Sequence, residues 1–271
     1  MKELLQPGLV SVTFRQMMPE AIVQLAARAG LRGIEWGGDI HAPPGDVLRA
    51  RHVRRLTQEA GLEVASYGSY LRLGERVGAP ISQRFAPVLD VACELGAPSI
   101  RVWAGNKASR EATPDDWQHV VDDALAIAQS AGEWGLDVAF EYHGGTLTDS
   151  PESARRLLES AVHPHLHALW QPGGEVETRP DALRHVLPRL LNLHVFHWDE
   201  TGRRPLSEGA AQWTKYLQVA AQTRRRHWAL LEFVRDDAPN ALLQDARTLL
   251  AWCAENHAAY SPLEPSASQQ K

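Results

Sequence analysis

Two glutamates at the ends of apolar runs are the residues of this chain most able to do chemistry. Glu141 follows the run over residues 138–140, and Glu232 follows the run over residues 229–231. Each run predicts a buried strand, where a terminal carboxylate is costly unless it is paired, protonated or bound to a cation. If both strands belong to one parallel barrel, their carboxyl ends share a face. The two carboxylates could then converge to move protons or to bind a metal ion.

Other polar and aromatic side chains follow the predicted strands and are further site candidates. They are Glu35, Trp36, Asp39, His41, Trp103, His143, Gln171, His194, His197 and Arg203. Carboxylate, imidazole and amide groups together suit a divalent cation such as Mn²⁺, Mg²⁺ or Zn²⁺. Because side chains alternate along a strand, His194 and His197 face opposite sides unless a bulge intervenes.

Each candidate has a structural alternative. Glu141 and Glu232 could form ion pairs with Arg101, Arg203 or Lys107 instead of acting on a substrate. A predicted loop carries Glu35, Asp39 and His41. These side chains could contact the substrate, or the loop could simply be exposed to solvent. The tryptophans Trp36 and Trp103 form either a flat wall for a sugar ring or part of the core at the barrel mouth.

A repeated helix–glycine–strand unit positions these residues. Gly30, Gly61, Gly96 and Gly135 each follow a helical pattern and precede an apolar run, at spacings of 31, 35 and 39 residues. Such a repeat predicts βα units, with the first strand over residues 9–14, the seventh over 191–196 and the eighth over 228–233. We expect one (β/α)₈ (TIM) barrel over residues 1–260 and a disordered tail over 261–271. A doubly wound sheet is less favoured, because no glycine-rich phosphate turn follows the first strand.

Composition limits the classes of partner. Hydrophobic residues make up 44% of the 271 residues, charged residues 23%, and the net charge is −5. This balance argues against binding to a nucleic-acid backbone, and no apolar stretch is long enough to cross a membrane. The chain opens with no signal-peptide pattern, and Cys93 and Cys253 lie inside helical patterns. We therefore expect a cytoplasmic protein, and a homo-oligomer is compatible with the sequence.

The chain resembles the xylose isomerase-like TIM barrels, the sugar phosphate isomerases and epimerases that include ketose 3-epimerases and inosose dehydratases. The resemblance rests on the stretch over residues 196–209 and on the positions of Glu141 and Glu232. It implies a metal held by Glu141, Gln171, His197 and Glu232, with His197 favoured over His194. It also implies a small-molecule carbohydrate substrate, which Arg203 binds. Gln171 stands where the family usually has an aspartate, so the site has lost one negative charge.

The resemblance implies a sugar or sugar-phosphate isomerase or epimerase in which Glu141 and Glu232 are catalytic. One glutamate would remove the proton beside a carbonyl and the other would return it, through an enediolate. The residues expected to bind substrate are Glu35, Trp36, His41, Trp103, His143, His194 and Arg203. Two alternatives stay open: an inosose-type dehydratase, and a sugar-binding barrel without metal-dependent turnover. An apurinic-site endonuclease is less favoured, because the chain is acidic.

Overall fold

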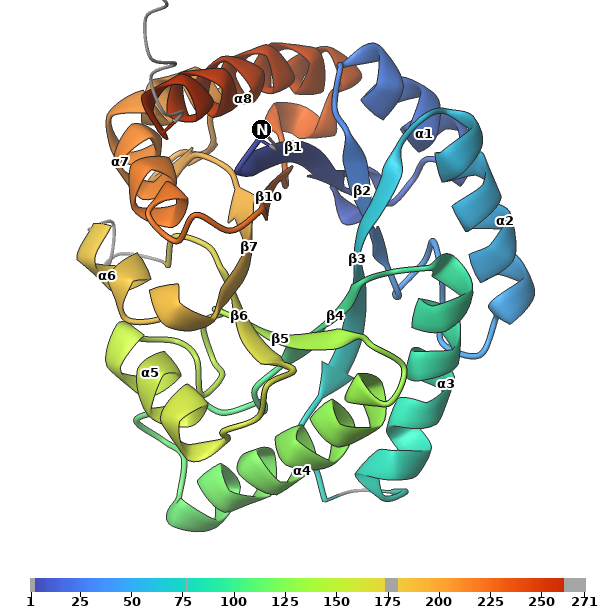
Figure 1. Ribbon diagram of the computed structural model, residues 1–271, viewed down its shortest axis with the longest axis vertical. Coiled ribbons are helices and arrows are strands. Elements are labelled where there is room, and N and C mark those ends of the chain that lie inside the picture. Colours follow the sequence, from blue (N-terminus) through green and yellow to red (C-terminus); the bar gives the residue numbers. More distant parts are fainter. Residues whose placement is uncertain (1–2, 77, 174–179, 261–271) are drawn as a thin grey trace, which may run out of the picture.

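The structure, a computed structural model, describes residues 3–76, 78–173 and 180–260. Eight parallel strands close into a barrel in the order β1-β10-β7-β6-β5-β4-β3-β2. Helices surround the barrel on its outside (Figure 1). This confirms the predicted (β/α)₈ barrel, whereas the predicted tail over residues 261–271 lies outside the described residues. No described helix is long and apolar enough to cross a membrane.

The barrel strands are short and mostly buried on both faces, as expected for a parallel sheet covered by helices. They are β1 (Leu5–Val10), β2 (Gly33–Gly37), β3 (Glu63–Arg72), β4 (Ser99–Trp103), β5 (Asp137–Glu141), β6 (Leu166–Trp170), β7 (Leu190–Val195) and β10 (His227–Leu231). The register places Glu141 beside Leu169 and Leu231 beside Val195. Glu141 therefore ends its strand, and Glu232 lies one residue beyond the end of β10.

The main helices follow the strands in alternation. They are α1 (Pro19–Arg28), α2 (Val47–Glu59), α3 (Ile81–Leu95), α4 (Pro114–Gly132), α5 (Pro151–Ser160), α6 (Pro180–Arg184), α7 (Ala210–Ala221) and α8 (Pro239–Tyr260). The short 3₁₀ turns are η1 (Ser11–Phe14), η2 (Leu187–Arg189), η3 (Leu206–Gly209) and η4 (Arg235–Asp237). The start of α4 is fixed by a capping box between Thr113 and Asp116. At the end of α3, Gly96 takes a left-handed conformation with φ 68°, which glycine adopts at low cost.

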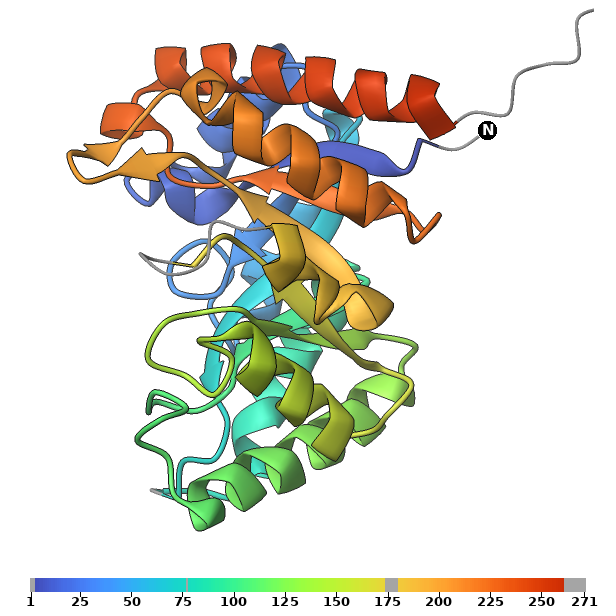
Figure 2. The ribbon, with the colours of Figure 1, turned by 90° about the vertical axis from the view of Figure 1, so that its left-hand side faces the viewer.

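Two local predictions differ from the structure. The first strand is β1, not residues 9–14, because η1 turns the chain away from the barrel after Val10. The second difference is a small antiparallel hairpin after β7 that the sequence pattern did not predict. It is formed by β8 (Trp198–Asp199) and β9 (Gly202–Arg203). Figure 2 shows this hairpin projecting from the side of the barrel opposite the N-terminus.

The buried core has two parts. The larger part packs the helices against the outside of the barrel, and the smaller part lies among β1, β3 and β10. Trp228 and Leu230 belong to this smaller part. Gly33 leaves the space that the Trp228 ring occupies, since a Cβ at Gly33 would lie 2.5 Å from the ring. The apolar base of the barrel thus gives way to charged side chains toward the carboxyl ends of the strands.

Candidate active site

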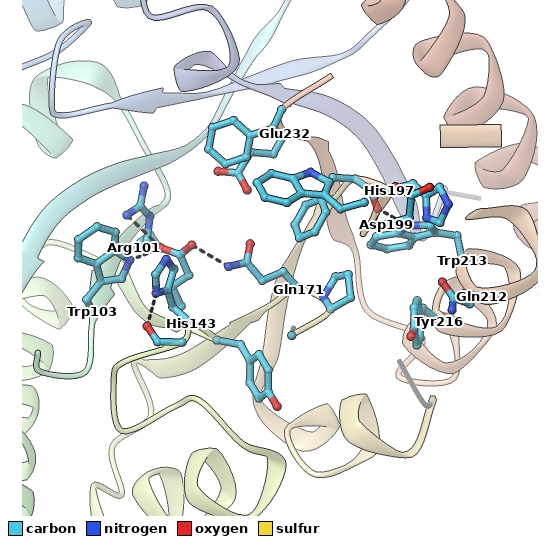
Figure 3. A pocket seen from close by; sticks show the side chains of 18 of the residues that line it. Arg101, Trp103, His143, Gln171, His197, Asp199, Gln212, Trp213, Tyr216 and Glu232 are labelled. Carbon is cyan, nitrogen blue, oxygen red and sulfur yellow. Dashed lines mark hydrogen bonds and ion pairs between the residues drawn. The ribbon is translucent and has the colours of Figure 1, made fainter. Parts of the chain in front are cut away.

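A pocket opens at the carboxyl ends of the barrel strands, where sites of this fold occur. Its volume is about 870 Å³, which is enough for a small substrate. The lining combines carboxylates, amides and many aromatic rings (Figure 3). The residues used below are Arg15, Tyr70, Arg101, Trp103, Glu141, His143, Gln171, Phe196, His197, Trp198, Glu232 and Phe233.

Glu141 is held by three donors. The indole N–H of Trp103 donates a short hydrogen bond to Glu141 Oε2. Gln171 Nε2 donates to Glu141 Oε1 at 3.1 Å, and Arg101 Nη1 lies 3.1 Å from Oε2. The carboxylate is therefore fixed in place and compensated by charge, because hydrogen bonds from a cation or a polar group favour its ionised form. The ion-pair alternative with Arg101 is present here.

Glu232 has fewer partners than Glu141. Its backbone N–H donates to Val195 O at 3.0 Å, which anchors the position beside the end of β7. Within the described part of the chain, its carboxylate pairs with His194, whose Nδ1 lies 3.3 Å from Oε2. The next residue, Phe233, has a positive φ of 54°, an unusual conformation for a residue with a side chain. The backbone at Glu232 is thus held by the sheet on one side and by a strained turn on the other.

A buried charge cluster lies beneath these two glutamates. His194 on β7 is fully buried, with Nε2 at 3.3 Å from Glu35 Oε1 and Nδ1 at 3.9 Å from Glu141 Oε1. Burial disfavours the charged imidazole, but the charges of Glu232 and Glu35 outweigh it and raise the pKa of His194 to about 10. Burial also opposes ionisation of Glu35, yet His194 and Arg101 hold the pKa of Glu35 below its usual value. His194 and Glu35 are therefore both held in their charged forms at neutral pH.

The charges of this cluster do not cancel. The carboxylates of Glu35, Glu141 and Glu232 face the two cationic side chains Arg101 and His194. One negative charge is left over when His194 is protonated, and two are left over when it is neutral. An excess of negative charge in a largely desolvated place favours a bound cation.

His194 and His197 occupy different parts of the site. Strand β7 ends at Val195, so His194 points inward with the alternation of the strand, whereas His197 lies beyond it. His197 lines the pocket and packs against Gly209, where an added Cβ would lie 2.9 Å from its ring. Figure 3 shows His197 beside Asp199, on the side of the pocket away from Arg101 and Trp103. The structure therefore does not form the predicted group of His197 with Glu141, Gln171 and Glu232. His194 contacts the two glutamates instead.

The other predicted substrate-binding residues divide into two groups. Trp103 and His143 line the pocket, with ring centroids 5.2 Å apart. Arg203 does not line the pocket, but it pairs with Asp237 and its Cζ lies 4.8 Å from the ring centroid of Phe233, which does.

Besides Arg203 and His194, three expected substrate contacts lie outside the pocket lining. Trp36 is fully buried and donates to Thr57 Oγ1 at 3.1 Å, so it belongs to the core. His41 is buried with Nδ1 at 3.0 Å from Ser11 Oγ. Glu35 is fully buried in the charge cluster rather than on a loop. The reason is that β2 extends through Gly37, so Glu35 and Trp36 point to opposite faces of a strand.

Sequence reasoning missed several pocket residues, of which Tyr70 is the clearest. It lies on β3 between two guanidinium groups: Arg15 Nη2 donates to its hydroxyl at 2.7 Å, and Arg101 lies 5.1 Å from its ring centroid. The sequence pattern also did not identify Phe196 and Phe233 as pocket residues, because aromatic residues near strand ends are equally typical of the hydrophobic core. The available signal was their position directly beside His197 and Glu232 in the chain.

The donor set is suited to a divalent cation only if an amide takes part. Within the described residues, no three or more histidine, cysteine, aspartate and glutamate side chains could by themselves hold a metal ion. Gln171 Oε1, both ring nitrogens of His194 and both carboxylate oxygens of Glu35 are buried and have no hydrogen-bond partner in the described part of the chain. Carboxylate and amide oxygens are donors of the kind that Mg²⁺ and Mn²⁺ take. Glu141, His194 and Glu232 are not by themselves a metal site as they stand, and Gln171 Oε1 is the neutral donor that a cation beside the two carboxylates would add.

Comparisons with known proteins agree with the fold. A curated relative, 3-dehydroshikimate dehydratase from Bacillus anthracis, is 25% identical over 89% of this chain and 95% of its own length. The crystal structure of the probable 3-DHS dehydratase AsbF from Bacillus anthracis has a TM-score of 0.77 and 21% identity, covering 90% of this chain and 98% of that one.

Two further solved structures share the fold. D-psicose 3-epimerase with D-tagatose, from Clostridium cellulolyticum H10, has a TM-score of 0.72 and 14% identity, covering 93% of this chain and 99% of that one. A xylose isomerase-like TIM barrel protein from Mycobacterium smegmatis in complex with magnesium has a TM-score of 0.72 and 13% identity, covering 93% and 97%. The family model described as xylose isomerase-like TIM barrel matches residues 23–255. The chain therefore belongs to the xylose isomerase-like TIM barrel family.

Proposed function

We propose that this protein is an enzyme that removes the proton beside a carbonyl group of a small hydroxylated substrate, and that it is a dehydratase. The observation that carries the proposal is the unequal environment of its two pocket carboxylates. Glu141 accepts from Trp103 and Gln171 and pairs with Arg101, whereas Glu232 contacts His194. Two carboxylates in different environments are suited to different roles.

Glu232 is the candidate base. It lines the pocket, and its carboxylate is less occupied by donors than that of Glu141. A carboxylate with fewer stabilising hydrogen bonds accepts a proton more readily, because less stabilisation of its charge is lost. His194 beneath it keeps the carboxylate oriented toward the pocket. Glu232 would therefore take the proton, while Glu141 is held in place by its three donors.

The reaction that suits one free base is loss of water from a β-hydroxy ketone. Glu232 breaks the C–H bond beside the carbonyl, and the electron pair moves onto the carbonyl oxygen to form an enolate. The enolate then expels the β-hydroxyl group as its C–O bond breaks, and the proton held by Glu232 returns to that hydroxyl. An unsaturated ketone and one water molecule are the products, and the glutamate is regenerated.

The shape of the pocket supports a ring-shaped substrate. Aromatic side chains from four barrel strands or the loops after them form its walls, namely Tyr70, Trp103, Phe196, Trp198 and Phe233. Flat apolar rings can pack against the faces of a cyclic substrate, while the carboxylates and amides contact its oxygen atoms. The curated relative named as a 3-dehydroshikimate dehydratase supports testing that cyclic hydroxy ketone first.

A divalent cation would be held by Glu141, Gln171, His194 and Glu232. When bound, a cation at this position polarises the substrate carbonyl and stabilises negative charge on its oxygen. Because His194 is protonated at neutral pH, a cation would have to displace that proton before Nδ1 could bind it. With His194 then neutral, the divalent charge would balance the excess left by the three carboxylates and Arg101. The buried, unpartnered Gln171 Oε1 supports this assignment within the described residues.

An isomerase or epimerase is the second candidate. Glu141 and Glu232 line the same pocket, so one could remove a proton and the other return it. The likeness in fold to D-psicose 3-epimerase is compatible with this reaction. The hydrogen bonds that hold Glu141 argue against it, because a proton-returning group must change its protonation state in each turnover.

The test is incubation with 3-dehydroshikimate, inososes and ketoses in D₂O with Mn²⁺ or Mg²⁺ supplied, followed by mass spectrometry. A product lighter than its substrate by one water supports the dehydratase. An isomer of unchanged mass with deuterium beside the carbonyl supports the isomerase or epimerase instead. If none of these compounds reacts or exchanges but a sugar binds, the non-catalytic binding protein is the better description.

A further inference from the structure

Tyr70 lies near the carboxyl end of β3 and lines the pocket, but the proposed reaction has not yet given it a role. It packs with the smaller part of the core, among β1, β3 and β10. Tyr67, three residues earlier on the same strand, packs with the larger, outer part. Because side chains alternate along a strand, residues three positions apart point to opposite faces. The Tyr70 side chain therefore points into the barrel, where it is half-buried at the pocket.

Three neighbours hold the Tyr70 side chain in place. Arg15 Nη2 donates a hydrogen bond to its hydroxyl oxygen at 2.7 Å. The guanidinium carbon of Arg101 lies 5.1 Å from the centroid of its ring, and the Trp103 ring meets that ring edge-on with centroids 5.3 Å apart. Cation–π and edge-to-face contacts fix an aromatic ring without using its hydroxyl proton.

The hydroxyl proton of Tyr70 remains for a ligand in the pocket. A phenol oxygen accepts hydrogen bonds and donates one through its single proton. In the described part of the chain, the hydrogen bond recorded for this hydroxyl is the one it accepts from Arg15. Burial raises the pKa of Tyr70 despite the opposing charges of Arg101 and Arg15, so the proton stays on the oxygen at neutral pH.

The two guanidiniums beside Tyr70 also lie close to the two pocket glutamates. Arg101 Nη1 lies 3.1 Å from Glu141 Oε2. The guanidinium carbon of Arg15 lies 5.8 Å from the aromatic ring of the residue that follows Glu232. The Tyr70 hydroxyl is therefore a donor in the pocket that holds both carboxylates.

The proposed reaction needs a donor of this kind. Loss of the proton beside the carbonyl places negative charge on the carbonyl oxygen, whereas the side chains that handle protons, Glu141 and Glu232, are acceptors. A donor already held in place where charge develops stabilises the transition state more than the bound substrate. Positive charge from Arg15 and Arg101 beside the phenol makes this part of the pocket the favourable one for an anion.

We propose that Tyr70 is a catalytic residue whose O–H donates a hydrogen bond to the carbonyl oxygen of the substrate, a bond that strengthens as the enolate forms. The inference rests on the proposed function, in which Glu232 removes the proton beside that carbonyl. The electron pair of the broken C–H bond reaches the carbonyl oxygen, and the phenol keeps its own proton throughout. Arg15 is a positioning residue, because its hydrogen bond to the phenol oxygen polarises the O–H group and leaves that proton for the pocket.

The first experiment measures turnover of 3-dehydroshikimate, and then of inososes and ketoses, by the parent, Tyr70→Phe and Tyr67→Phe with Mn²⁺ supplied. Tyr70→Phe should lower kcat by about 10²- to 10³-fold, the usual effect of removing one such donor. Its KM should stay within a few-fold of the parent, because the lost bond is strongest in the transition state.

Tyr67→Phe is the matched control. It removes the same atom from the same strand, but the Tyr67 hydroxyl donates to Ala42 O at 2.9 Å and is buried in the outer core. This variant should have a lower melting temperature and a parental kcat. Tyr70→Phe should show the opposite pattern, with a melting temperature close to that of the parent.

The outcomes separate the inference from the proposed function. A parental kcat in Tyr70→Phe, or a raised KM with unchanged kcat, would overturn the role of Tyr70 and leave the reaction standing. A comparable loss of kcat in Tyr67→Phe would assign the effect to a general disturbance of β3 and would overturn that role too. If the parent neither converts any of these compounds nor exchanges the proton beside the carbonyl, the proposed function and the inference both fail.

Arg15→Met covers the case in which Tyr70→Phe fails to fold. It keeps the phenol and removes the group that polarises it, at a side chain that is 40% exposed. It should lower kcat, by less than Tyr70→Phe does, and should have no further effect on kcat when the two changes are combined. A parental kcat in Arg15→Met, or losses that multiply fully in the double variant, would contradict the action of Arg15 through Tyr70.

Discussion

Gln171 Nε2 donates a hydrogen bond to Glu141 Oε1 at 3.1 Å. The residue expected as a metal ligand therefore gives its amide nitrogen to the neighbouring carboxylate, and its oxygen stays buried without a partner among the described residues. This arrangement ties the orientation of Glu141 to a neutral side chain. It also places an unused acceptor where an aspartate would bring a negative charge.

Gln171→Asp should tighten Mn²⁺ binding and weaken the metal-free protein. The added charge favours a cation, but it also removes a donor to Glu141 and repels that carboxylate. The melting temperature should therefore fall without metal and recover when Mn²⁺ is added, with tighter binding by calorimetry. Gln171→Asn, which is as short as aspartate but neutral, is the control for side-chain length. Unchanged or weaker affinity in Gln171→Asp would place residue 171 away from the cation.

His194→Ala and His197→Ala should differ in their effect on metal binding. His194 lies 3.3 Å from Glu232 Oε2, whereas His197 packs beside Gly209 at the other side of the pocket. Loss of His194 should therefore reduce Mn²⁺ affinity strongly, and loss of His197 should leave it within a few-fold. Calorimetry on both variants decides between the two histidines. The opposite pattern would restore His197 as the ligand expected from the sequence.

Glu232→Gln should abolish turnover while leaving the barrel folded. Glutamine preserves the shape but cannot accept a proton, and loss of a general base costs about 10² to 10⁴ in rate. Turnover and exchange of the substrate proton for deuterium are the measurements, and far-ultraviolet circular dichroism checks the fold. Glu141→Gln is the companion variant, which should lose turnover through the arrangement with Arg101. Exchange at the parental rate in Glu232→Gln would show that another group is the base.

Arg101→Met should destabilise the protein strongly, because it leaves Glu35 and Glu141 with one cation fewer in a buried place. Breaking a buried ion pair on one side costs about 3–5 kcal/mol. Arg76→Met is the control, since Arg76 pairs with a buried aspartate but is itself 45% exposed. Urea unfolding of both variants gives the comparison, and an equal loss in the two would show that the buried cluster has no special dependence on Arg101.

Stability should fall as the pH is lowered from about 6.5 to about 4, in part because of His227. Burial lowers the pKa of this histidine to about 4. The folded protein keeps His227 neutral, with Nδ1 at 2.8 Å from Leu191 O. The unfolded chain binds a proton near pH 6.5, so the contribution of His227 is complete above that pH and is lost as the pH falls.

Urea unfolding of the parent and His227→Gln at several pH values measures this contribution. The variant should lose less stability than the parent between pH 6.5 and pH 4, by up to about 3 kcal/mol. Parallel pH profiles for the two proteins would mean that His227 does not titrate in this range.

Local rules were enough to predict much of the architecture from the sequence. The caps at Thr113 and Ser150 and the left-handed glycines such as Gly96 set the ends of helices through interactions within a few residues. The position of Glu141 at a strand end follows from hydrophobic patterning in the same way. Once the strands are known to be parallel, Glu141 and Glu232 must open on the same face, as the pocket lining shows.

The assignment of side chains to pocket, barrel interior or outer core depended on the tertiary structure. Trp36 and Glu35 are neighbours in the chain, but one lies in the outer core and the other in the charge cluster. His194 contacts the glutamates and His197 does not, because β7 ends between them, at Val195. A shift of one residue in a strand reverses the face of every side chain, and pairing with neighbouring strands fixes that register. The sequence by itself determined which groups were available for chemistry, and closure of the barrel decided which of them meet.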